Sequence, residues 1–116
     1  MIDAHLHLNR LPPFAAAQAR EHGVTGFLTT GTSPADWAET LALSAPDVKP
    51  FIGTHPWFAD RHDQALLERL LIDNPVAGVG EIGLDAKAPP EQDAVFALQF
   101  ALAAKLGRPA VIHCVR

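Results

Sequence analysis

The chain has 116 residues with 13 acidic and 9 basic side chains, so its formal net charge is −4. Its length suits one domain over residues 1–116, and a composition of 48% hydrophobic and 19% charged residues excludes a disordered chain. No apolar run approaches the ~20 residues that span a bilayer, no signal peptide is recognisable, and one cysteine cannot form an internal disulfide. We therefore expect a cytoplasmic protein with no membrane partner, and the negative charge disfavours a basic nucleic-acid-binding surface.

Five short segments have the pattern of β-strands. Residues 1–7 alternate between apolar and polar side chains, and the other four segments cover 24–30, 49–54, 76–81 and 109–113. Their first residues lie about 23 to 33 positions apart, which is the length of one strand–helix unit.

The segments between these strands have the marks of helices. The first ends before Gly23, the second begins at Ser33-Pro34-Ala35-Asp36, and the third carries a leucine stripe over 66–71. A fourth helix is expected over about 90–106, ending at Gly107. Its apolar face is expected to consist of Phe96, Phe100 and Ala103.

This repetition of strand and helix predicts an α/β fold of parallel strands joined by right-handed crossovers. A doubly wound sheet and part of a (β/α)₈ barrel both remain open on this pattern alone. In either architecture, active sites form at the carboxyl ends of the strands.

Histidines and carboxylates gather at those strand ends. In Asp3-x-His5-x-His7 the spacing places all three side chains on one face of the first strand, so both imidazoles can reach one metal ion and Asp3 can orient a ligand. The alternative is an N-terminal strand with one polar face. Glu81 is expected to close the fourth strand, where a buried carboxylate requires a cation or strong hydrogen-bond donors; its alternative is a solvated group that caps the next helix.

His113 closes the fifth strand, where a lone histidine is more often a hydrogen-bonded core residue than a metal ligand. Cys114 points the other way and is read as a small core hydrophobe. Asp85 can point into the same site, although a loop aspartate is more often simply solvated.

Thr54-His55-Pro56-Trp57 follows the third strand. His55 can contact a substrate phosphate or support a ligand, and Trp57 or Phe58 can stack on a base. A loop histidine beside a core tryptophan is an equal alternative. His22 and His62 fall away from the strand ends and receive no role.

His5, His7, Glu81 and His113 together form a set of nitrogen and oxygen donors without thiolates. Such a set suits Zn²⁺, Mn²⁺ or a similar divalent ion, and a hydrolytic two-metal site more than a structural zinc site.

Five motifs in this order resemble the TatD family of metal-dependent deoxyribonucleases, which belong to the amidohydrolase-like superfamily. The motifs are Asp3-x-His5-x-His7, Gly53-x-His55-Pro56, Gly80-Glu81-Ile82-Gly83-Leu84-Asp85, Gln92-x-x-x-Phe96-x-x-Gln99 and Pro109-x-x-Ile112-His113.

The resemblance implies a TIM-barrel fold, two divalent metal ions (Mg²⁺, Mn²⁺ or Zn²⁺) and DNA as the substrate. It implies that His5 and His7 bind one ion, that Glu81 bridges two, that His113 binds the second, and that His55 lines the same site.

The family takes a further histidine and a catalytic aspartate from later strands, which this chain does not contain. A closed barrel usually needs ~250 residues, so we expect roughly the first five strands of a truncated barrel, with bare edges that are open to pairing with another chain, including a second copy. The leading hypothesis is a deoxyribonuclease that uses metal-activated water. The alternatives are an inactive or partner-dependent half-barrel and a metallohydrolase that acts on another ester or amide.

Overall fold

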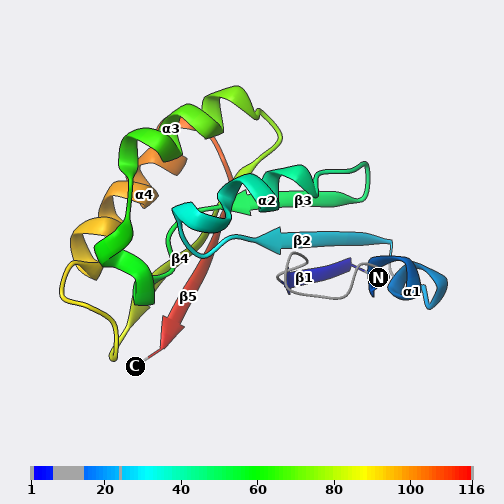
Figure 1. The fold of residues 1–116 in the computed structure, drawn as a ribbon, viewed down its shortest axis with the longest axis horizontal. Helices are drawn as coiled ribbons and strands as arrows, with labels where there is room; N and C mark the ends of the chain where they lie inside the picture. The colour runs from blue at the N-terminus through cyan, green and yellow to red at the C-terminus, as the bar shows by residue number, and fades with distance from the viewer. Residues whose placement is uncertain (1, 7–14, 24, 116) are drawn as a thin grey trace.

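The computed structural model describes residues 2–6, 15–23 and 25–115. Strands and helices alternate along this part of the chain (Figure 1). In order, they are β1 (Ile2–Leu6), α1 (Ala15–Glu21), β2 (Gly26–Thr30), the 3₁₀ helix η2 (Pro34–Asp36), α2 (Trp37–Ala42), β3 (Val48–Ile52), the 3₁₀ helix η3 (Pro56–Arg61), α3 (Gln64–Asp73), β4 (Gly78–Asp85), α4 (Gln92–Leu106) and β5 (Ala110–Val115).

The five described strands form one sheet in the order β1-β2-β3-β4-β5, and every neighbouring pair is parallel. The sheet curls, and α2, α3 and α4 lie along its outer side (Figure 1). This arrangement confirms the predicted succession of parallel strand–helix units, curved as in part of a barrel rather than doubly wound. It brings the carboxyl ends of the strands to one edge.

The fourth strand is longer than predicted. It continues from Gly78 to Asp85 because the parallel pairing with β5 runs on as far as Asp85 and Val115. Glu81 therefore lies within β4 rather than at its end, and that prediction is wrong. The sequence pattern does not predict this longer strand because glycine is rare in strand interiors, and β4 contains Gly80 and Gly83.

Gly83 has a structural reason for its place in β4. Its φ is +153°, and a Cβ atom there would overlap the carbonyl oxygen of His113 on β5. The missing side chain therefore permits the close approach of the two strands that carry Glu81 and His113.

The helix boundaries follow the predicted end signals closely. The buried Asp36 carboxylate accepts hydrogen bonds from the backbone N–H of Thr32 at 2.9 Å and from that of Ser33 at 3.3 Å, which stabilises the start of the second helical segment. At the other end of the fold, α4 stops at Gly107, which has a left-handed φ of 66°.

The predicted apolar face of α4 is right for Ala103, which is buried, and for Phe96, which is partly buried and packs against the core. It is wrong for Phe100, which is 51% exposed. The buried side of the helix also includes Gln99, whose amide is hydrogen-bonded inside the protein, so hydrophobicity alone could not locate this residue.

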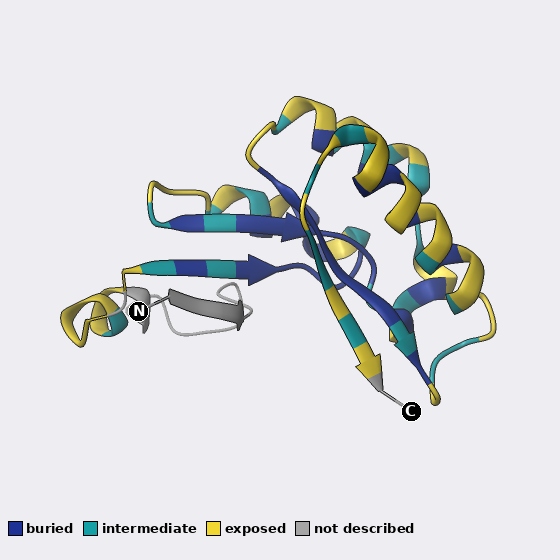
Figure 2. Ribbon diagram, turned by 180° about the vertical axis from the view of Figure 1, so that it is seen from behind, coloured by how far each residue is buried: buried dark blue, intermediate teal, exposed yellow. Residues whose placement is uncertain are grey.

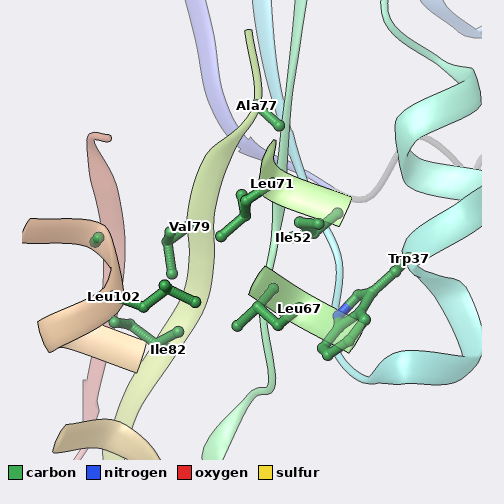
Figure 3. Close-up of a cluster of buried hydrophobic side chains, with 9 residues drawn as sticks. Trp37, Ile52, Leu67, Leu71, Ala77, Val79, Ile82 and Leu102 are labelled. Carbon is green, nitrogen blue, oxygen red and sulfur yellow. The ribbon is translucent and has the colours of Figure 1, made fainter. Parts of the chain in front are cut away.

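The core lies between the sheet and the helices on its outer side. Figure 2 shows β4 buried over most of its length, while the outward sides of the helices are exposed. Leu67 and Leu71 of α3 pack against strand residues, as the leucine stripe predicted. The buried cluster drawn in Figure 3 includes Trp37, Ile52, Leu67, Leu71, Ala77, Val79, Ile82 and Leu102.

Among the described helices, none combines the length and the apolar character that crossing a membrane requires.

Candidate metal centre

Three predicted site residues meet at the carboxyl edge of the sheet. His55 follows β3, Glu81 lies in β4 and His113 lies in β5. Each offers a ligand atom, and these atoms all lie within 4.8 Å of one another. The parallel arrangement explains the convergence, since it places residues from successive units at the same edge.

The Asp3-x-His5-x-His7 motif is described only in part. Asp3 and His5 belong to β1, which pairs with β2, but their side chains lie outside the description, and His7 lies outside the described residues altogether. Their roles as metal ligands and as a supporting carboxylate stay predictions.

The imidazole of His113 lies between two carboxylates. Its Nδ1 atom is 3.0 Å from Oε2 of Glu81, and its Nε2 atom is 3.1 Å from Oδ2 of Asp85. Both carboxylates are buried, with Glu81 2% and Asp85 5% exposed. Burial of two acidic groups is unfavourable unless cations or hydrogen-bond donors compensate for it, so each of these two carboxylates requires such a partner.

Several donors surround the Asp85 carboxylate. Its Oδ1 atom accepts the backbone N–H of Lys87 at 3.0 Å, and its Oδ2 atom accepts the indole N–H of Trp57 at 2.9 Å. The Lys87 hydrogen bond contributes most, ahead of His113 and Trp57, to lowering the pKa of Asp85 to about 2. Asp85 is therefore an ionised group at neutral pH.

His55 begins the 3₁₀ helix η3. Its Nδ1 atom accepts the backbone N–H of Trp57 at 3.1 Å, an N-terminal cap supplied by an imidazole. The centroid of its ring is 4.5 Å from that of His113 and 5.4 Å from the indole of Trp57. The Trp57 side chain is 56% exposed beside this cluster, so it is accessible from solvent.

The backbone that carries His55 is fixed from several sides. The fully buried Gln99 accepts the N–H of Thr54 at 2.7 Å and donates to the carbonyl of the same residue at 3.1 Å. The indole of Trp37 donates to the carbonyl of Gly53 at 2.7 Å. These contacts hold the loop after β3 against α2 and α4.

His62 also supports this loop. Its Nδ1 atom is 2.7 Å from the Thr54 hydroxyl, and its Nε2 atom is 2.6 Å from Oε1 of Gln64. The prediction that His62 lies away from the strand ends is therefore wrong, because the short helix η3 returns the chain to the end of β3.

Cys114 is the other correction near the site. It is exposed rather than part of the core. Alternation along β5 turns His113 toward the carboxylates and Cys114 to the opposite side, where none of the described residues buries it.

The sequence patterns identified His55, Glu81 and His113 as site residues. They assigned smaller roles to Asp85 and Trp57, which hydrogen-bond to these histidines. Asp85, which the sequence allows in the site but more often as a solvated loop residue, is buried and contacts His113. The indole of Trp57, for which the sequence predicts stacking on a base, donates to Asp85. The motif Gln92-x-x-x-Phe96-x-x-Gln99 was the available signal for the supporting amides. Gln92 Oε1 accepts the backbone N–H of Asp85 at 2.8 Å.

The donor chemistry fits a divalent ion. A buried glutamate oxygen and an imidazole nitrogen are ligands that Zn²⁺, Mn²⁺ and similar ions accept, and the described cluster contains no thiolate. A cation beside Glu81 would also offset the unfavourable burial of its charge.

Comparison with known proteins places this chain in a family. A family model described as TatD related DNase matches residues 2–116. A relative from Edwardsiella piscicida, named 3'-5' ssDNA/RNA exonuclease TatD, is 39% identical in an alignment of 112 residues that covers 88% of this chain and 43% of the relative. A relative of the same name from Dickeya dadantii is 37% identical over 110 residues, covering 84% and 41% of the two chains. The chain thus spans less than half the length of these curated relatives.

Solved structures agree on the fold. The YJJV protein of Escherichia coli K12, described as a TatD homologue, superposes with a TM-score of 0.82 and 27% identity, over all of this chain and 51% of that one. A TatD-like protein from Archaeoglobus fulgidus has the same fold, with a TM-score of 0.72 at 22% identity, over all of this chain and 56% of its own. The ordered motifs, the curved parallel sheet and the match over residues 2–116 show that the chain belongs to the TatD-related DNase family.

Proposed function

We propose that this chain forms the first half of a metal-dependent nuclease that hydrolyses phosphodiester bonds in DNA. The observation that carries the proposal is the cluster of His55, Glu81 and His113 at the carboxyl edge of the sheet. The family match and the relatives named as exonucleases support it.

Glu81 and His113 are the described residues proposed to hold a divalent ion, with His5 and His7 as the predicted ligands of a second one. A divalent ion at such a site supplies Lewis-acid polarisation of the phosphoryl group and activation of water. Mg²⁺, Mn²⁺ and Zn²⁺ are the candidates, since all three are compatible with oxygen and nitrogen donors.

His55 and Trp57 are proposed to meet the substrate. The ring centroid of His55 lies 4.5 Å from that of His113 within this cluster, where an imidazole N–H can donate to a phosphate oxygen. The exposed Trp57 ring offers a stacking surface for an unpaired base, and such stacking is worth about 1–3 kcal/mol per base. This pairing favours a single-stranded substrate, in line with the name of the relatives.

A cleavage assay with the purified chain tests the proposal. Labelled single-stranded and duplex DNA are incubated with Mg²⁺, Mn²⁺ or Zn²⁺, with and without EDTA. We expect cleavage of single-stranded DNA that EDTA abolishes and that Glu81→Gln lowers at least about 100-fold, because loss of a ligand should exceed the ~10–100-fold effect of losing an outer partner. Glu68→Gln is the matched control, since Glu68 pairs with Lys105 on the surface and should leave cleavage unchanged.

Other outcomes separate the remaining hypotheses. Hydrolysis of carboxyl esters or amides without DNA cleavage would point to a metallohydrolase of different specificity. Metal binding without turnover on any substrate would favour a half-barrel that requires the later strands of the family. Cleavage that persists in Glu81→Gln would contradict the assigned site.

A further inference from the structure

The loop that follows β2 holds the backbone of two site residues. The carbonyl oxygen of Gly31 accepts the backbone N–H of Glu81 at 3.1 Å, and that of Thr32 accepts the backbone N–H of His55 at 2.8 Å. β3 ends before this point, so β4 hydrogen-bonds directly to the loop after β2. The placement of Glu81 and His55 therefore depends on the direction in which these two carbonyl groups point.

A buried carboxylate lies on the other side of this loop. The side chain of Asp36 accepts the N–H of Thr32 at 2.9 Å and that of Ser33 at 3.3 Å through Oδ1, and the hydroxyl of Thr32 at 2.6 Å through Oδ2. One carboxylate oxygen can serve two N–H donors because it has two lone pairs. Gly31 leaves room for this approach, since a Cβ atom there would lie 2.9 Å from Oδ1 of Asp36.

Two consecutive peptide units are thus shared between Asp36 and the site. The first contains the C=O of Gly31 and the N–H of Thr32, and the second contains the C=O of Thr32 and the N–H of Ser33. Both units are trans, so the N–H and the C=O point in opposite directions from one rigid plane. Because Asp36 holds each N–H, each plane is kept from turning and its C=O stays directed at a site residue.

Helix capping explains only part of the Asp36 contact. In a capping box, the side chain three residues into a helix binds the N–H of the N-cap residue, and Asp36 does this for Ser33. Thr32 precedes the N-cap, so its N–H is not among the groups that a helix start leaves without a partner. Its hydrogen bond to Asp36 is nevertheless the shorter of the two. Asp36 therefore also orders the loop before the helix.

We propose that Asp36 is a positioning residue of the site, which fixes the backbone of Glu81 and of His55 through these two peptide units. The proposal rests on the proposed function, because Glu81 and His55 are the residues proposed to bind the ion and to meet the substrate. It adds a residue that the sequence pattern identifies only as part of a helix start. The hydrogen bonds of Gln99 and Trp37 hold other peptide groups, those of the loop after β3.

Amide hydrogen exchange of the metal-free chain, followed by NMR, tests the proposal without reference to activity. Each site amide has a reference amide close to it in sequence, whose hydrogen-bond partner lies outside the loop after β2: Val79 for Glu81, and Thr54 for His55. In Asp36→Ala we expect exchange at the two site amides to accelerate at least about tenfold more than at their references. A general loss of stability accelerates all four amides alike, so unchanged ratios would overturn the proposal.

Three further variants separate positioning from helix stability. Asp36→Asn keeps an acceptor oxygen for the two N–H groups, so it should retain most of the protection. Asp36→Ser keeps a residue that is favoured at helix starts but ends one atom short of these groups, so it should behave as Asp36→Ala and provides the test if that variant does not fold. Thr40→Val is the matched control, because it removes a hydroxyl that donates to the backbone carbonyl of Asp36 at 2.9 Å and leaves the carboxylate in place.

Zn²⁺ titration by calorimetry gives the second readout. Asp36→Ala should lower the affinity about tenfold or more, as expected when a group that supports a metal ligand is lost, whereas Thr40→Val should leave it unchanged. Asp36→Asn should bind Zn²⁺ more tightly than Asp36→Ala does.

Equal effects of Asp36→Ala and Thr40→Val on the exchange ratios would reduce Asp36 to a helix cap and overturn the proposal. Equal effects of Asp36→Ala and Asp36→Asn would also overturn it, since the acceptor oxygen would then have no part in the positioning. If the unmodified chain binds no Zn²⁺, the proposed metal site fails, and the exchange ratios still decide whether Asp36 positions Glu81 and His55.

Discussion

At the scale of single residues, His62 beside the candidate site shows how neighbours set the protonation of a side chain. Burial lowers its pKa below 6.5, and the hydrogen bond to Gln64 and the charge of Asp63 oppose that shift only in part. The folded protein therefore favours the neutral ring, which suits its contact with the Thr54 hydroxyl.

This shift predicts a pH dependence of folding stability. Because the folded-state pKa lies below the unfolded value, the stability from neutral His62 is fully present above about pH 6.5 and is lost as the pH falls through that value toward the folded-state pKa. We expect thermal unfolding between pH 7.5 and 5.5 to show a smaller decline of Tm in His62→Gln than in the unmodified chain. His22→Gln, at an exposed position, is the control, and equal declines in all three proteins would contradict the assignment.

At the scale of elements, α4 supports the site through amides as well as through apolar packing. Gln99 and Gln92 lie seven residues apart, close to two helical turns, so both face the sheet. Gln99 binds the backbone after β3, and Gln92 binds the end of β4. One helix thus fixes the two segments that carry His55 and Asp85.

A pair of substitutions on α4 tests this account. Gln99→Leu should lower the free energy of unfolding by about 3 kcal/mol, because it leaves a buried N–H and a buried C=O of Thr54 without partners. Phe100→Gln, at a residue that is 51% exposed, should change it by less than about 0.5 kcal/mol. Urea denaturation measures both. The opposite ranking would restore Phe100 to the buried face of α4, where hydrophobicity predicts it.

Sequence patterns predicted the elements better than the contacts between them. Parallel strand–helix units, the capped start of the second helical segment and the end of α4 at Gly107 all follow from local signals. Glu81 lies inside β4 because the pairing with β5 continues past two glycines, and such pairing is a long-range property. The buried Gln99 and the position of His62 likewise depend on tertiary hydrogen bonds, which no local pattern contains.

For the site as well, local patterns identify the residues, whereas the contacts between them depend on the folded chain. His55, Glu81 and His113 were identified because strand ends of a parallel fold meet at one edge. The hydrogen bonds that position these histidines come from Trp57 and Asp85, which are 28 residues apart in sequence and joined only in the folded chain.

At the scale of the whole molecule, β5 is an edge of the described sheet and presents apolar surface. Ile112 on this strand is 50% exposed, and Leu98 of α4 is 49% exposed. Exposed strand edges of this kind favour pairing between chains.

We therefore expect concentration-dependent self-association of the chain in size-exclusion chromatography with light scattering. Ile112→Lys should reduce it, because a charged side chain on an edge strand opposes pairing. The variant should keep its affinity for Zn²⁺, since Ile112 points away from the face that carries His113. Self-association that Ile112→Lys leaves unchanged would place the contact elsewhere.

Glu81 and His113, at the carboxyl edge of the sheet, are the pair proposed to hold a divalent ion. Anomalous diffraction from crystals of the chain grown with Mn²⁺ is the sharpest test of this metal centre, because the signal locates the ion without reference to activity. We expect a peak within coordination distance of a Glu81 oxygen and of a ring nitrogen of His113. A well-ordered Glu81 and His113 without such a peak, or a peak only at other residues, would contradict it.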